Sequence, residues 1–488
     1  MGLLVKKPMN LLMQEASAEG EHSLKRSLTA LNLTALGIGA IIGAGIFVLT
    51  GTAAANHAGP AIVLSFVFAG IGCAFAGLCY AEFASMIPIA GSAYTYGYAT
   101  LGEFFAWIIG WDLILEYLFA ASTVAVGWAG YFSRMMTLIG FPIPEALANA
   151  PYRIEGTHTL VRTGAIINLP AVILVLALTA LLVVGIKESA RFNNAIVAVK
   201  LIIVLLVIGF GFMFVNKANW HPFIPPIEVD AASGVSKFGW PGIFAGAGVI
   251  FFAYIGFDAV STAAQEAKNP KRDLPIGILA SLAICTVLYI LMALVMTVLT
   301  PFKTLNVADP VYVALDAAGP GLAWLKYLTT IGAIAGLASV VLVMLMGQPR
   351  IFYAMSRDGL LPEMFGKVHP KFKTPYIATI ITGLVAAGVA GAFPIGLLGE
   401  LVSIGTLLAF VIVCAGILVL RYAQPDLHRP FRTPFVPFVP IGGVLVCGWL
   451  MWNLPRDTWL RLLIWMALGL VIYFAYGRNH SKLQNAQR

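Results

Sequence analysis

The chain has 488 residues, of which 60% are hydrophobic and only 11% are charged. A soluble protein cannot cover its surface with so few charges, so the composition indicates a polytopic membrane protein. The formal net charge is +8, and its placement, described below, reflects membrane topology and contact with anionic lipid rather than nucleic-acid binding. The five cysteines lie in apolar runs without metal-ligand spacing, so we expect neither disulfides nor a metal site.

A helix needs about 20 apolar residues to cross a bilayer. A polar tail, residues 1–32, precedes twelve apolar runs that we predict to span: 33–55, 61–87, 104–133, 169–186, 194–216, 242–263, 277–300, 324–347, 376–393, 400–422, 437–453 and 460–477. The last two are short. No loop is long enough for a soluble domain, which predicts one all-α membrane domain.

The basic residues predict the orientation of the spans. With the N-terminus inside, the inner segments hold 20 Lys and Arg residues and the outer segments nine, while Lys200 lies within a span. Because cytoplasmic loops carry the excess of Lys and Arg, we expect both termini, including the tail 478–488, to lie in the cytoplasm. The expected location is the inner (plasma) membrane of the cell, with multiple passes.

The first span is unusual because it contains Gly37, Gly39, Gly43 and Gly45. Each Gly weakens a helix interior by roughly 1 kcal/mol relative to Ala. One explanation is close helix packing through Gly39 and Gly43. The other is a helix unwound at Gly43-Ala44-Gly45, which is tolerated at membrane depth only where the backbone is buried in protein or lines a cavity. We favour the broken helix.

Glycines also interrupt the sixth span, at positions 242, 246, 248 and 256, just before Phe257 and Asp258. Five spans separate the two interruptions, so the two segments have opposite orientations, as an inverted repeat requires. Paired interruptions in corresponding places point to the binding site of a transporter. Two unrelated Gly-rich packing faces remain the alternative.

An unwound segment also indicates a class of substrate. The helix half after Gly45 directs its positive end and free N–H groups at the break, which favours a carboxylate. Carbonyl groups at Ile41, Phe252 and Ile255 would bind an ammonium group. A site that holds both groups with backbone atoms would recognise an α-amino acid.

Five ionisable residues lie within the predicted spans and away from the outermost residues of each span, where such groups are costly and usually functional: Glu82, Asp112, Glu116, Lys200 and Asp258. Lys200 lies nine residues after Arg191, about 13 Å of helix rise into the fifth span. Burial disfavours its charge, so we expect Lys200 to take up and release a proton, and to donate to carbonyls of the broken first helix. A permanent pair with a carboxylate is the alternative.

Glu116 lies near the middle of the third span and shares a helix face with Asp112. It could pair with Lys200, attract a substrate ammonium, carry a proton, or bond to neighbouring hydroxyls and matter only for packing. These four roles stay open. We expect Glu82, near the inner end of the second span, to be structural.

The second break is surrounded by aromatic residues. Asp258 follows the break and is expected to organise the half-helix after it, with Tyr254 and Phe257 in gating or structural roles. Phe252 either closes over the substrate or belongs to the core.

An enzymatic function has no residues to support it. The glycines at 37–43 lack the spacing and the preceding strand of a nucleotide-binding motif. Seven histidines lie outside the spans, and no nucleophile–base pair is apparent. We therefore expect no enzyme, no cofactor and no nucleic-acid partner.

Several motifs resemble those of the amino acid–polyamine–organocation (APC) transporters. They are Gly-x-Gly-x-Ile-Ile-Gly-Ala-Gly-Ile-Phe at 37–47, Pro60, Tyr80-Ala81-Glu82, Gly91-Ser92-Ala93-Tyr94, Phe257-Asp258, Asn269-Pro270-x-Arg272-x-x-Pro275 and Arg357-Asp358-Gly359-x-x-Pro362. The resemblance covers nearly the whole chain. Trp111-Asp112-Leu113-x-x-Glu116-Tyr117 and the twelve predicted spans are similar to the bacterial relatives of the cationic amino acid transporters (CAT).

The resemblance implies the LeuT-type fold, in which two five-helix repeats have inverted orientations and spans one and six are unwound. The repeats would be residues 33–216 and 242–422, followed by two peripheral helices in 437–477. The resemblance implies that Ala44 and Gly45 bind the substrate carboxylate and that Met344 lines the side-chain end of the pocket. The residues expected at the substrate site are Ile41, Gly43, Ala44, Gly45, Ile46, Glu116, Ala120, Phe252, Ile255 and Met344.

The family also implies a coupling ion. Lys200 matches the fifth-span lysine of proton-coupled members and stands where sodium-coupled relatives bind an ion, so we expect proton coupling without a sodium site. The proton would be carried by Lys200, Glu116 or both. Ala44 lacks the hydroxyl found in some relatives, and Met344 is apolar. Small neutral amino acids such as alanine are therefore favoured, while a broad or cationic range stays open.

The sequence thus predicts a proton-coupled L-amino acid importer that works by alternating access. Its rivals are an exchanger of amino acids or amines without net proton flux, and a membrane sensor without transport. Expected partners are the substrate and membrane lipid. Binding of a small membrane protein or a sterol-like lipid at the outer helices stays open.

Overall fold

The computed structural model describes residues 4–8, 28–87, 92–155, 159–184, 190–229, 236–372 and 374–486. Within them, eight helical segments are long and apolar enough to cross a membrane: Gly45–Met86, Glu103–Leu138, Asn194–Phe214, Gly239–Ser261, Pro270–Leu299, Pro320–Arg357, Ile395–Ala423 and Arg456–Asn485. Four shorter apolar helices accompany them: α2 (Ala30–Ile41), α8 (Leu169–Val184), α15 (Tyr376–Ala392) and α17 (Phe438–Trp452). The chain is an all-α polytopic membrane protein.

The first half of the chain also contains η1 (Gly45–Leu49), α3 (Thr50–Ala53), η2 (Ala54–Ala58), η3 (Gly59–Ala61), α4 (Ile62–Met86), α5 (Ser92–Thr100), α6 (Glu103–Leu138), α7 (Glu145–Ala148), α9 (Ala190–Gly211), η4 (Phe212–Phe214) and η5 (Lys217–Trp220). Two short antiparallel strand pairs lie in its connections. Strand β1 (Tyr152–Glu155) pairs with β2 (Thr159–Arg162), with Tyr152 opposite Arg162. Strand β3 (Glu228–Val229) pairs with β4 (Ser236–Lys237), with Glu228 opposite Lys237.

The second half contains α10 (Gly239–Ile250), η6 (Phe251–Tyr254), α11 (Ala259–Thr262), η7 (Ala264–Glu266), α12 (Pro270–Leu299), η8 (Phe302–Leu305), α13 (Pro310–Ala317), η9 (Pro320–Leu322), α14 (Ala323–Arg357), η10 (Glu363–Gly366) and α16 (Ile395–Ala423). After α17 follow α18 (Arg456–Ile472), η11 (Tyr473–Gly477), α19 (Arg478–His480) and α20 (Lys482–Ala486).

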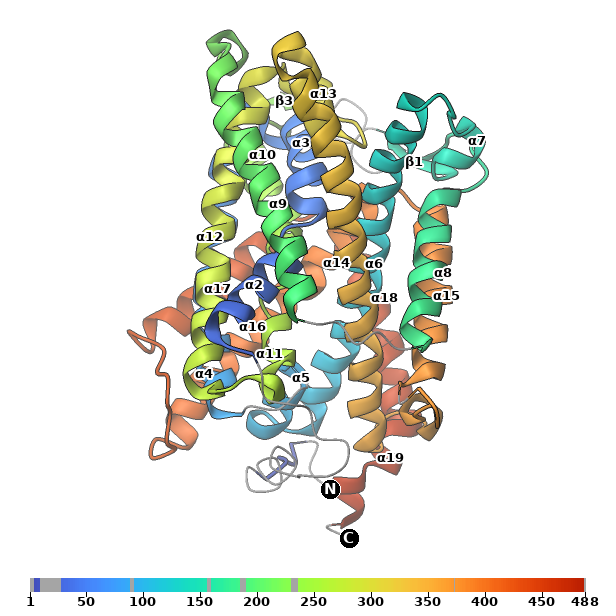
Figure 1. Cartoon of the computed structure of the whole chain (residues 1–488). Helices are drawn as coiled ribbons and strands as arrows, with labels where there is room; N and C mark the ends of the chain where they lie inside the picture. The colour runs from blue at the N-terminus through green and yellow to red at the C-terminus, as the bar shows by residue number, and fades with distance from the viewer. Residues whose placement is uncertain are drawn as a thin grey trace.

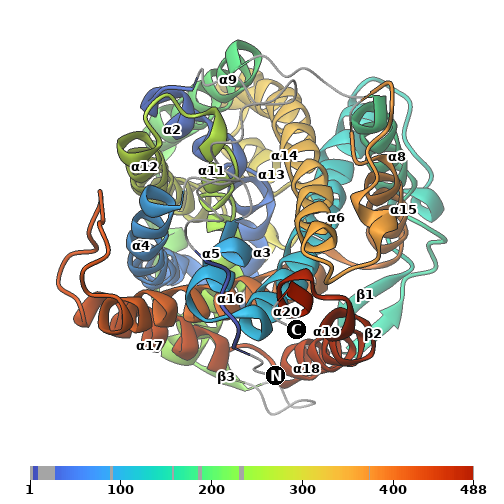
Figure 2. The ribbon, with the colours of Figure 1, turned by 90° about the horizontal axis from the view of Figure 1, so that it is seen from below.

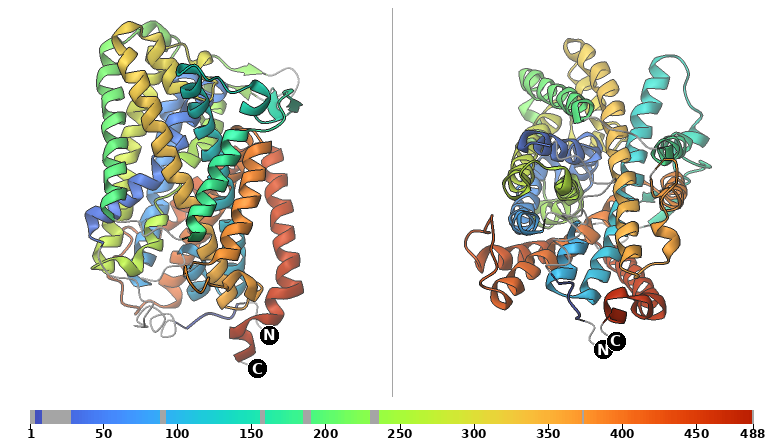
Figure 3. Two further views of the ribbon diagram at one scale, coloured as in Figure 1. Left: turned by 45° about the vertical axis from the view of Figure 1, so that its right-hand side comes forward. Right: turned by 60° about the horizontal axis from the view of Figure 1, so that its bottom comes forward.

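Most of the long helices, among them α6, α9, α12 and α14, run roughly parallel in a bundle, whereas α17 lies obliquely across it (Figure 1). Seen end-on in Figure 2, α3 and α11 lie near the centre, and α4, α6, α12 and α14 lie around them. Helices α8 and α15 pack as a pair beside α6, and α18 runs along the outside, as the two views of Figure 3 show. The interrupted segments are therefore enclosed by longer, continuous helices.

The described parts of both tails lie at one end of the bundle, which we call the termini end (Figure 1). The Lys7 ammonium donates to the Asp358 carboxylate at 2.9 Å, and the Lys482 amide donates to the Asp358 carbonyl at 3.1 Å. Most of the predicted N-terminal tail (residues 1–3 and 9–27), Gly91 of the fourth family motif, and residues 487–488 lie outside the described residues.

Each of the twelve predicted spans contains helix, but several helices run beyond the predicted limits. Helix α14 continues to Arg357, where the sequence predicted an end at 347, and α6 continues to Leu138 instead of 133. Polar residues such as Gln348 and Arg350 mark the edge of the apolar run, but they do not break the backbone hydrogen-bond ladder. Apolar length therefore predicts the membrane-buried part and not the whole helix.

Glu82 holds the second helix to the chain after α16. Its carboxylate is completely buried and accepts two hydrogen bonds from Arg421, at 2.9 and 2.8 Å. The Arg429 Nε lies 3.1 Å from the same carboxylate, and the Thr433 amide donates to it at 2.8 Å. These contacts agree with the structural role expected for Glu82.

Candidate functional site

The first apolar helix is interrupted at the glycine cluster. Helix α2 ends at Ile41, the Ile42 backbone is extended (φ −72°, ψ 94°), and the π-helical turn η1 begins at Gly45. The first N–H groups of a helix have no acceptor within it, and they form its positive end. The backbone after the break therefore presents donors at the level where α2 stops.

A second interruption lies between α10 and α11. The 3₁₀ turn η6 ends at Tyr254, and Ile255 is extended (φ −61°, ψ 135°). Gly256 has φ +121°, a conformation that side-chain-bearing residues rarely adopt. A Cβ at Gly256 would also lie 2.8 Å from the carbonyl carbon of Ala40. This glycine therefore serves both the turn and the close approach of the first break.

The two interruptions touch each other. A Cβ at Gly45 would lie 2.4 Å from the Cβ of Ala253 and 2.5 Å from its Cα, so only glycine fits there. The Tyr289 hydroxyl of α12 lies 2.7 Å from the Ile41 carbonyl and 2.6 Å from the Ala253 carbonyl. A hydroxyl has one proton, so it donates to one of these oxygens at a time. Tyr289 thus links both breaks, and nothing in the sequence pattern singled it out.

The side chain of Lys200, on α9, reaches the first break. It is 1% exposed, and its ammonium donates to the carbonyls of Gly39 at 3.0 Å and Ile42 at 3.2 Å. None of the ion pairs between described residues includes Lys200. The carbonyls that lost their helical partners at the end of α2 therefore bind the ammonium group, which has no paired carboxylate within the described part of the chain.

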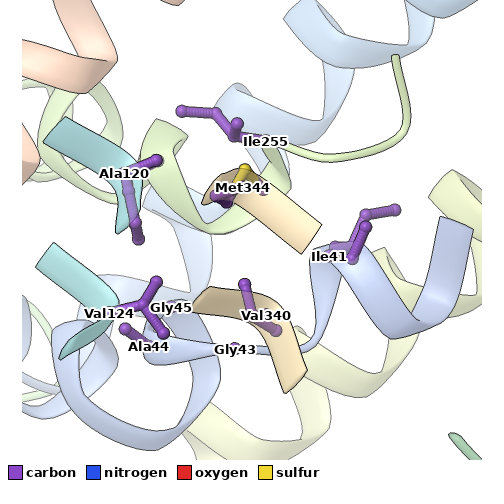
Figure 4. A pocket seen from close by; sticks show the side chains of 11 residues that line it. Ile41, Gly43, Ala44, Gly45, Ala120, Val124, Ile255, Val340 and Met344 are labelled. Atoms are coloured by element: carbon purple, nitrogen blue, oxygen red, sulfur yellow. The ribbon is translucent and has the colours of Figure 1, made fainter. Parts of the chain in front are cut away.

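A small cavity of about 10 Å³, room for about one water molecule, lies between the breaks and helices α6 and α14 in this conformation. Its lining consists of Ala40, Ile41, Gly43, Ala44, Gly45, Ala120, Val124, Phe252, Ile255, Val340 and Met344. The side chains labelled in Figure 4 contain carbon and the single sulfur of Met344, without oxygen or nitrogen. The polar groups available to a ligand among these residues are therefore backbone N–H and C=O groups.

The structure brings most of the predicted site residues together. Eight of the ten line the cavity, and Ile46 and Glu116 do not. Ile46 is completely buried within η1, one residue beyond the lining. Sequence reasoning missed Ala40, Val124 and Val340, because a small or branched apolar residue in an apolar helix looks the same whether it faces a cavity or the core.

Glu116 lies one helical turn before Ala120 on α6 and is 2% exposed. Its carboxyl group lies against the Thr406 side chain of α16, whose hydroxyl donates to the Val402 carbonyl at 3.0 Å. Asp112, one turn earlier, is completely buried, and neither of its carboxyl oxygens has a hydrogen-bond partner among the described residues. Glu116 therefore stands beside the cavity, against α16 and apart from Lys200.

Asp258 fixes the second break to α6. Its carboxylate accepts from the Gly256 amide at 3.3 Å and from the Tyr117 hydroxyl of α6 at 3.3 Å. It also stands at the N-terminus of α11, the half-helix that it was expected to organise.

The aromatic residues around the second break differ in their positions. Tyr254 is completely buried, and its hydroxyl donates to the Phe66 carbonyl at 2.8 Å. The ring of Phe257 packs on Tyr80 and Phe410, at centroid distances of 5.7 and 5.1 Å. Phe252, by contrast, lines the cavity. Tyr254 and Phe257 are therefore packing residues in this conformation, and Phe252 is the aromatic residue of the break that faces the cavity.

Beyond the first break, toward the end opposite the termini, the chain is tightly packed. Phe47 and Val48 are completely buried. The Tyr131 hydroxyl of α6 donates to the Phe47 carbonyl at 2.7 Å. A Cβ at Gly127 would lie 3.1 Å from Val48. In this conformation η1 is thus closed against α6.

Comparison with known proteins supplies an independent line of evidence. A family model described as "Amino acid permease" matches residues 28–474. The chain is 48% identical to the methylthioribose transporter of Bacillus subtilis (strain 168), over 99% of both chains. It is 50% identical to the branched-chain amino acid permease BcaP of the same organism, over 96% of both chains. It is 33% identical to the vacuolar cationic amino acid transporter 4 of Arabidopsis thaliana, over 96% of this chain and 94% of that protein.

Proposed function

The chain belongs to the amino acid permease family of the APC superfamily, as a relative of its CAT branch, and we propose that it imports neutral L-amino acids by proton-coupled alternating access. The observation that carries the proposal is the cavity between two helix breaks, whose lining offers polar backbone groups and apolar side chains. The relatives named above are all transporters or permeases, which supports transport rather than catalysis.

The proposed recognition uses the backbone for both charged ends of the substrate. The carboxylate would accept from the N–H groups of Ala44 and Gly45, at the positive end of the helix half after the break. The ammonium would donate to the carbonyls of Ile41, Phe252 and Ile255. The Ile41 carbonyl already lies 2.7 Å from Tyr289, but a carbonyl oxygen has two lone pairs and can accept a second hydrogen bond.

The proposed side-chain preference follows from the lining. Ala120, Val124, Val340 and Met344 contribute no charge, so a cationic side chain would have no partner among the lining residues. We favour small neutral amino acids such as alanine and extend the range to branched apolar side chains, because BcaP is named a branched-chain amino acid permease. Methylthioribose has neither a carboxylate nor an ammonium for the backbone groups, so it is the weaker candidate despite the transporter of that name.

The proposed architecture is the LeuT-type arrangement of two inverted five-helix repeats plus two peripheral helices, with twelve spans. Breaks in the first and sixth apolar segments, in contact with each other, support it. Placing the termini end in the cytoplasm agrees with the excess of Lys and Arg on that side. The protein would then lie in the plasma membrane.

The proposed coupling group is Lys200. A protonated ammonium would hold the carbonyls of Gly39 and Ile42, and deprotonation would release the end of α2 on the cytoplasmic side. This cycle needs a proton and no sodium ion. Exchange of amino acids without net proton flux is the alternative, because the same backbone site serves both modes and fold alone does not separate them.

Uptake into proteoliposomes tests the substrate class. The panel contains labelled alanine, leucine, isoleucine, arginine and methylthioribose, each measured with an acid-outside gradient, with a sodium gradient, and in counterflow. We expect alanine or the branched-chain amino acids to accumulate with the proton gradient alone. Uptake of methylthioribose without any amino acid would overturn the amino acid assignment. Counterflow of amino acids without gradient-driven accumulation would favour the exchanger.

A further inference from the structure

Helices α9 and α14 pack against each other through two glycines of α14 that lie one turn apart, Gly332 and Gly336. A Cβ at Gly336 would lie 3.0, 3.3 and 3.5 Å from the Cε, Cγ and Cδ atoms of Lys200. A Cβ at Gly332 would instead meet the terminal methyl group of Ile203 at 2.0 Å. Neither glycine has a positive φ. Their lack of a side chain therefore matters for space and not for backbone conformation.

We propose that Gly336 is a positioning residue for Lys200: its bare backbone forms the slot along which the lysine stem reaches the broken end of α2. This proposal rests on the coupling role proposed above for Lys200. In this role Gly336, on α14, orients the ammonium group of a lysine that belongs to α9.

The contacts of Lys200 explain why such a slot is needed. A lysine side chain loses roughly 1.5–2 kcal/mol of rotamer freedom when it is fixed in one conformation. Among the described residues, two carbonyls accept hydrogen bonds from its ammonium, at 3.0 and 3.2 Å. Three consecutive carbons of the lysine stem lie against Gly336. Packing therefore fixes the stem, while no carboxylate among the described residues pairs with the ammonium group.

The neighbourhood of Lys200 contains few other polar groups that could reposition it. The end of α2 contributes the two carbonyls, and α12 contributes the thiol of Cys285, which lies nearby. Tyr289, one turn beyond Cys285 on α12, is already hydrogen-bonded to the breaks. A shift of a few tenths of an ångström at the stem would therefore lengthen the weaker ammonium contact beyond hydrogen-bond range, with no other acceptor to replace it among these neighbours.

The first test compares Gly336→Ala and Gly336→Val with the matched control Gly332→Ala. All three substitutions place a side chain at the α9–α14 contact, but the control meets the flexible end of Ile203. We expect Gly336→Ala to lower proton-driven accumulation roughly tenfold, as the loss of one hydrogen bond from a charged group would. Gly336→Val should lower it further, with an altered pH profile, whereas Gly332→Ala should keep the wild-type profile. Equal losses in the two alanine variants, with unchanged pH profiles, would overturn the proposal.

The second test does not depend on transport. Melting temperatures are compared for Gly336→Ala and Gly332→Ala in the wild-type and Lys200→Ala backgrounds. Without the lysine stem the slot is empty, so Gly336→Ala should lower the melting temperature only when Lys200 is present, while Gly332→Ala should have the same effect in both backgrounds. Equal effects of Gly336→Ala in both backgrounds would refute the slot, whatever the transport assays show. If wild-type uptake is not proton-driven, the proposed function fails, and the melting cycle still decides on the slot. The melting comparison uses only alanine variants, so its result remains valid even if Gly336→Val does not fold.

Discussion

The ammonium of Lys200 binds two backbone carbonyls, where a buried lysine more often has a carboxylate partner. Both carbonyls belong to the last turn of α2 and the residue after it. In the proposed cycle, protonation of this one group would therefore act directly on the backbone at the end of α2. The contact would then link a proton to the position of a helix end without an intermediate side chain.

The sequence located Lys200 because a charge within an apolar run is conspicuous. It did not locate the partners of Lys200, because carbonyl acceptors are the same at every residue. Sequence reasoning did not identify Tyr289 and Gly336 for a related reason, because a tyrosine or a glycine in an apolar helix usually serves only packing. Val124 and Val340 face the cavity, but their apolar character alone gave no sign of it.

Removal of the lysine head should uncouple transport from the proton gradient. For Lys200→Ala we expect pH-driven accumulation to fall at least about tenfold, because hydrogen bonds from charged groups contribute roughly 1.5–3 kcal/mol each. Substrate binding should be partly retained, since Lys200 does not line the cavity. Binding is measured by the substrate-induced rise in melting temperature.

Glu116 offers a second test at the residue scale. Because its carboxyl group contacts Thr406 and does not line the cavity, Glu116→Gln should change the substrate affinity by less than about twofold. It should, however, change the pH dependence of uptake, if the group carries a proton during the cycle. Thr406→Val serves as the control that removes the contact and keeps the carboxylate. An unchanged pH profile in Glu116→Gln would reduce Glu116 to a packing residue.

At the scale of elements, the glycine clusters predicted where the helices break. The physical reason is visible at Gly45 and Gly256, where a side chain would collide with the other interrupted segment. The ends of the continuous helices were predicted less well, because apolar length marks the membrane and not the last hydrogen-bonded turn. Contacts between distant segments, such as Glu82 with Arg421, were not predictable, because no local pattern relates residues 339 positions apart.

Contact between the two breaks can be tested by adding one methyl group. Gly45→Ala should destabilise the protein by about 1–3 kcal/mol, because the Cβ would overlap the backbone of Ala253. Gly388→Ala in α15 is the matched control, since nothing lies within 4 Å of its added Cβ. That variant should be neutral or more stable by up to about 1 kcal/mol. Thermal melting in detergent measures both, and equal stability of the two variants would contradict the described contact.

An ion pair between α6 and the start of α13 can be tested through pH. Arg134 donates to Asp309 at 2.6 Å, and burial raises the pKa of the Asp309 carboxyl although Arg134 opposes the rise. Without the arginine, the pKa of Asp309 should rise further. Arg134→Gln should therefore lower the stability by about 1–3 kcal/mol at neutral pH.

The sign of the pH effect follows from the raised pKa. An acid whose pKa is higher in the folded state destabilises the fold when it is ionised, and the penalty disappears as the pH falls through the folded pKa. The deficit of Arg134→Gln should thus shrink on acidification, and the double variant Arg134→Gln/Asp309→Asn should lose this pH dependence. A deficit that is constant with pH would show that the lost arginine acts through packing.

At the scale of the whole molecule, composition and apolar run length were sufficient to predict an all-α membrane protein. Family membership was predictable as well, because its motifs are distributed over nearly the whole chain. The arrangement of the helices in space depends on tertiary contacts that the sequence did not reveal. Examples are the hydrogen bonds that Lys7 and Lys482 donate to Asp358. The described fold places the two breaks, the lysine and the cavity together at the centre of the bundle.

The coupling role of Lys200 can be tested by uptake of labelled alanine and leucine into proteoliposomes under an acid-outside gradient, with wild type and Lys200→Ala compared under the same conditions. A sodium gradient is the ion control, and counterflow shows that the variant is folded and binds substrate. We expect the wild type to accumulate substrate with the proton gradient alone, and Lys200→Ala to retain counterflow without accumulation. Accumulation by Lys200→Ala at the wild-type level would contradict the central claim that Lys200 couples the proton to transport.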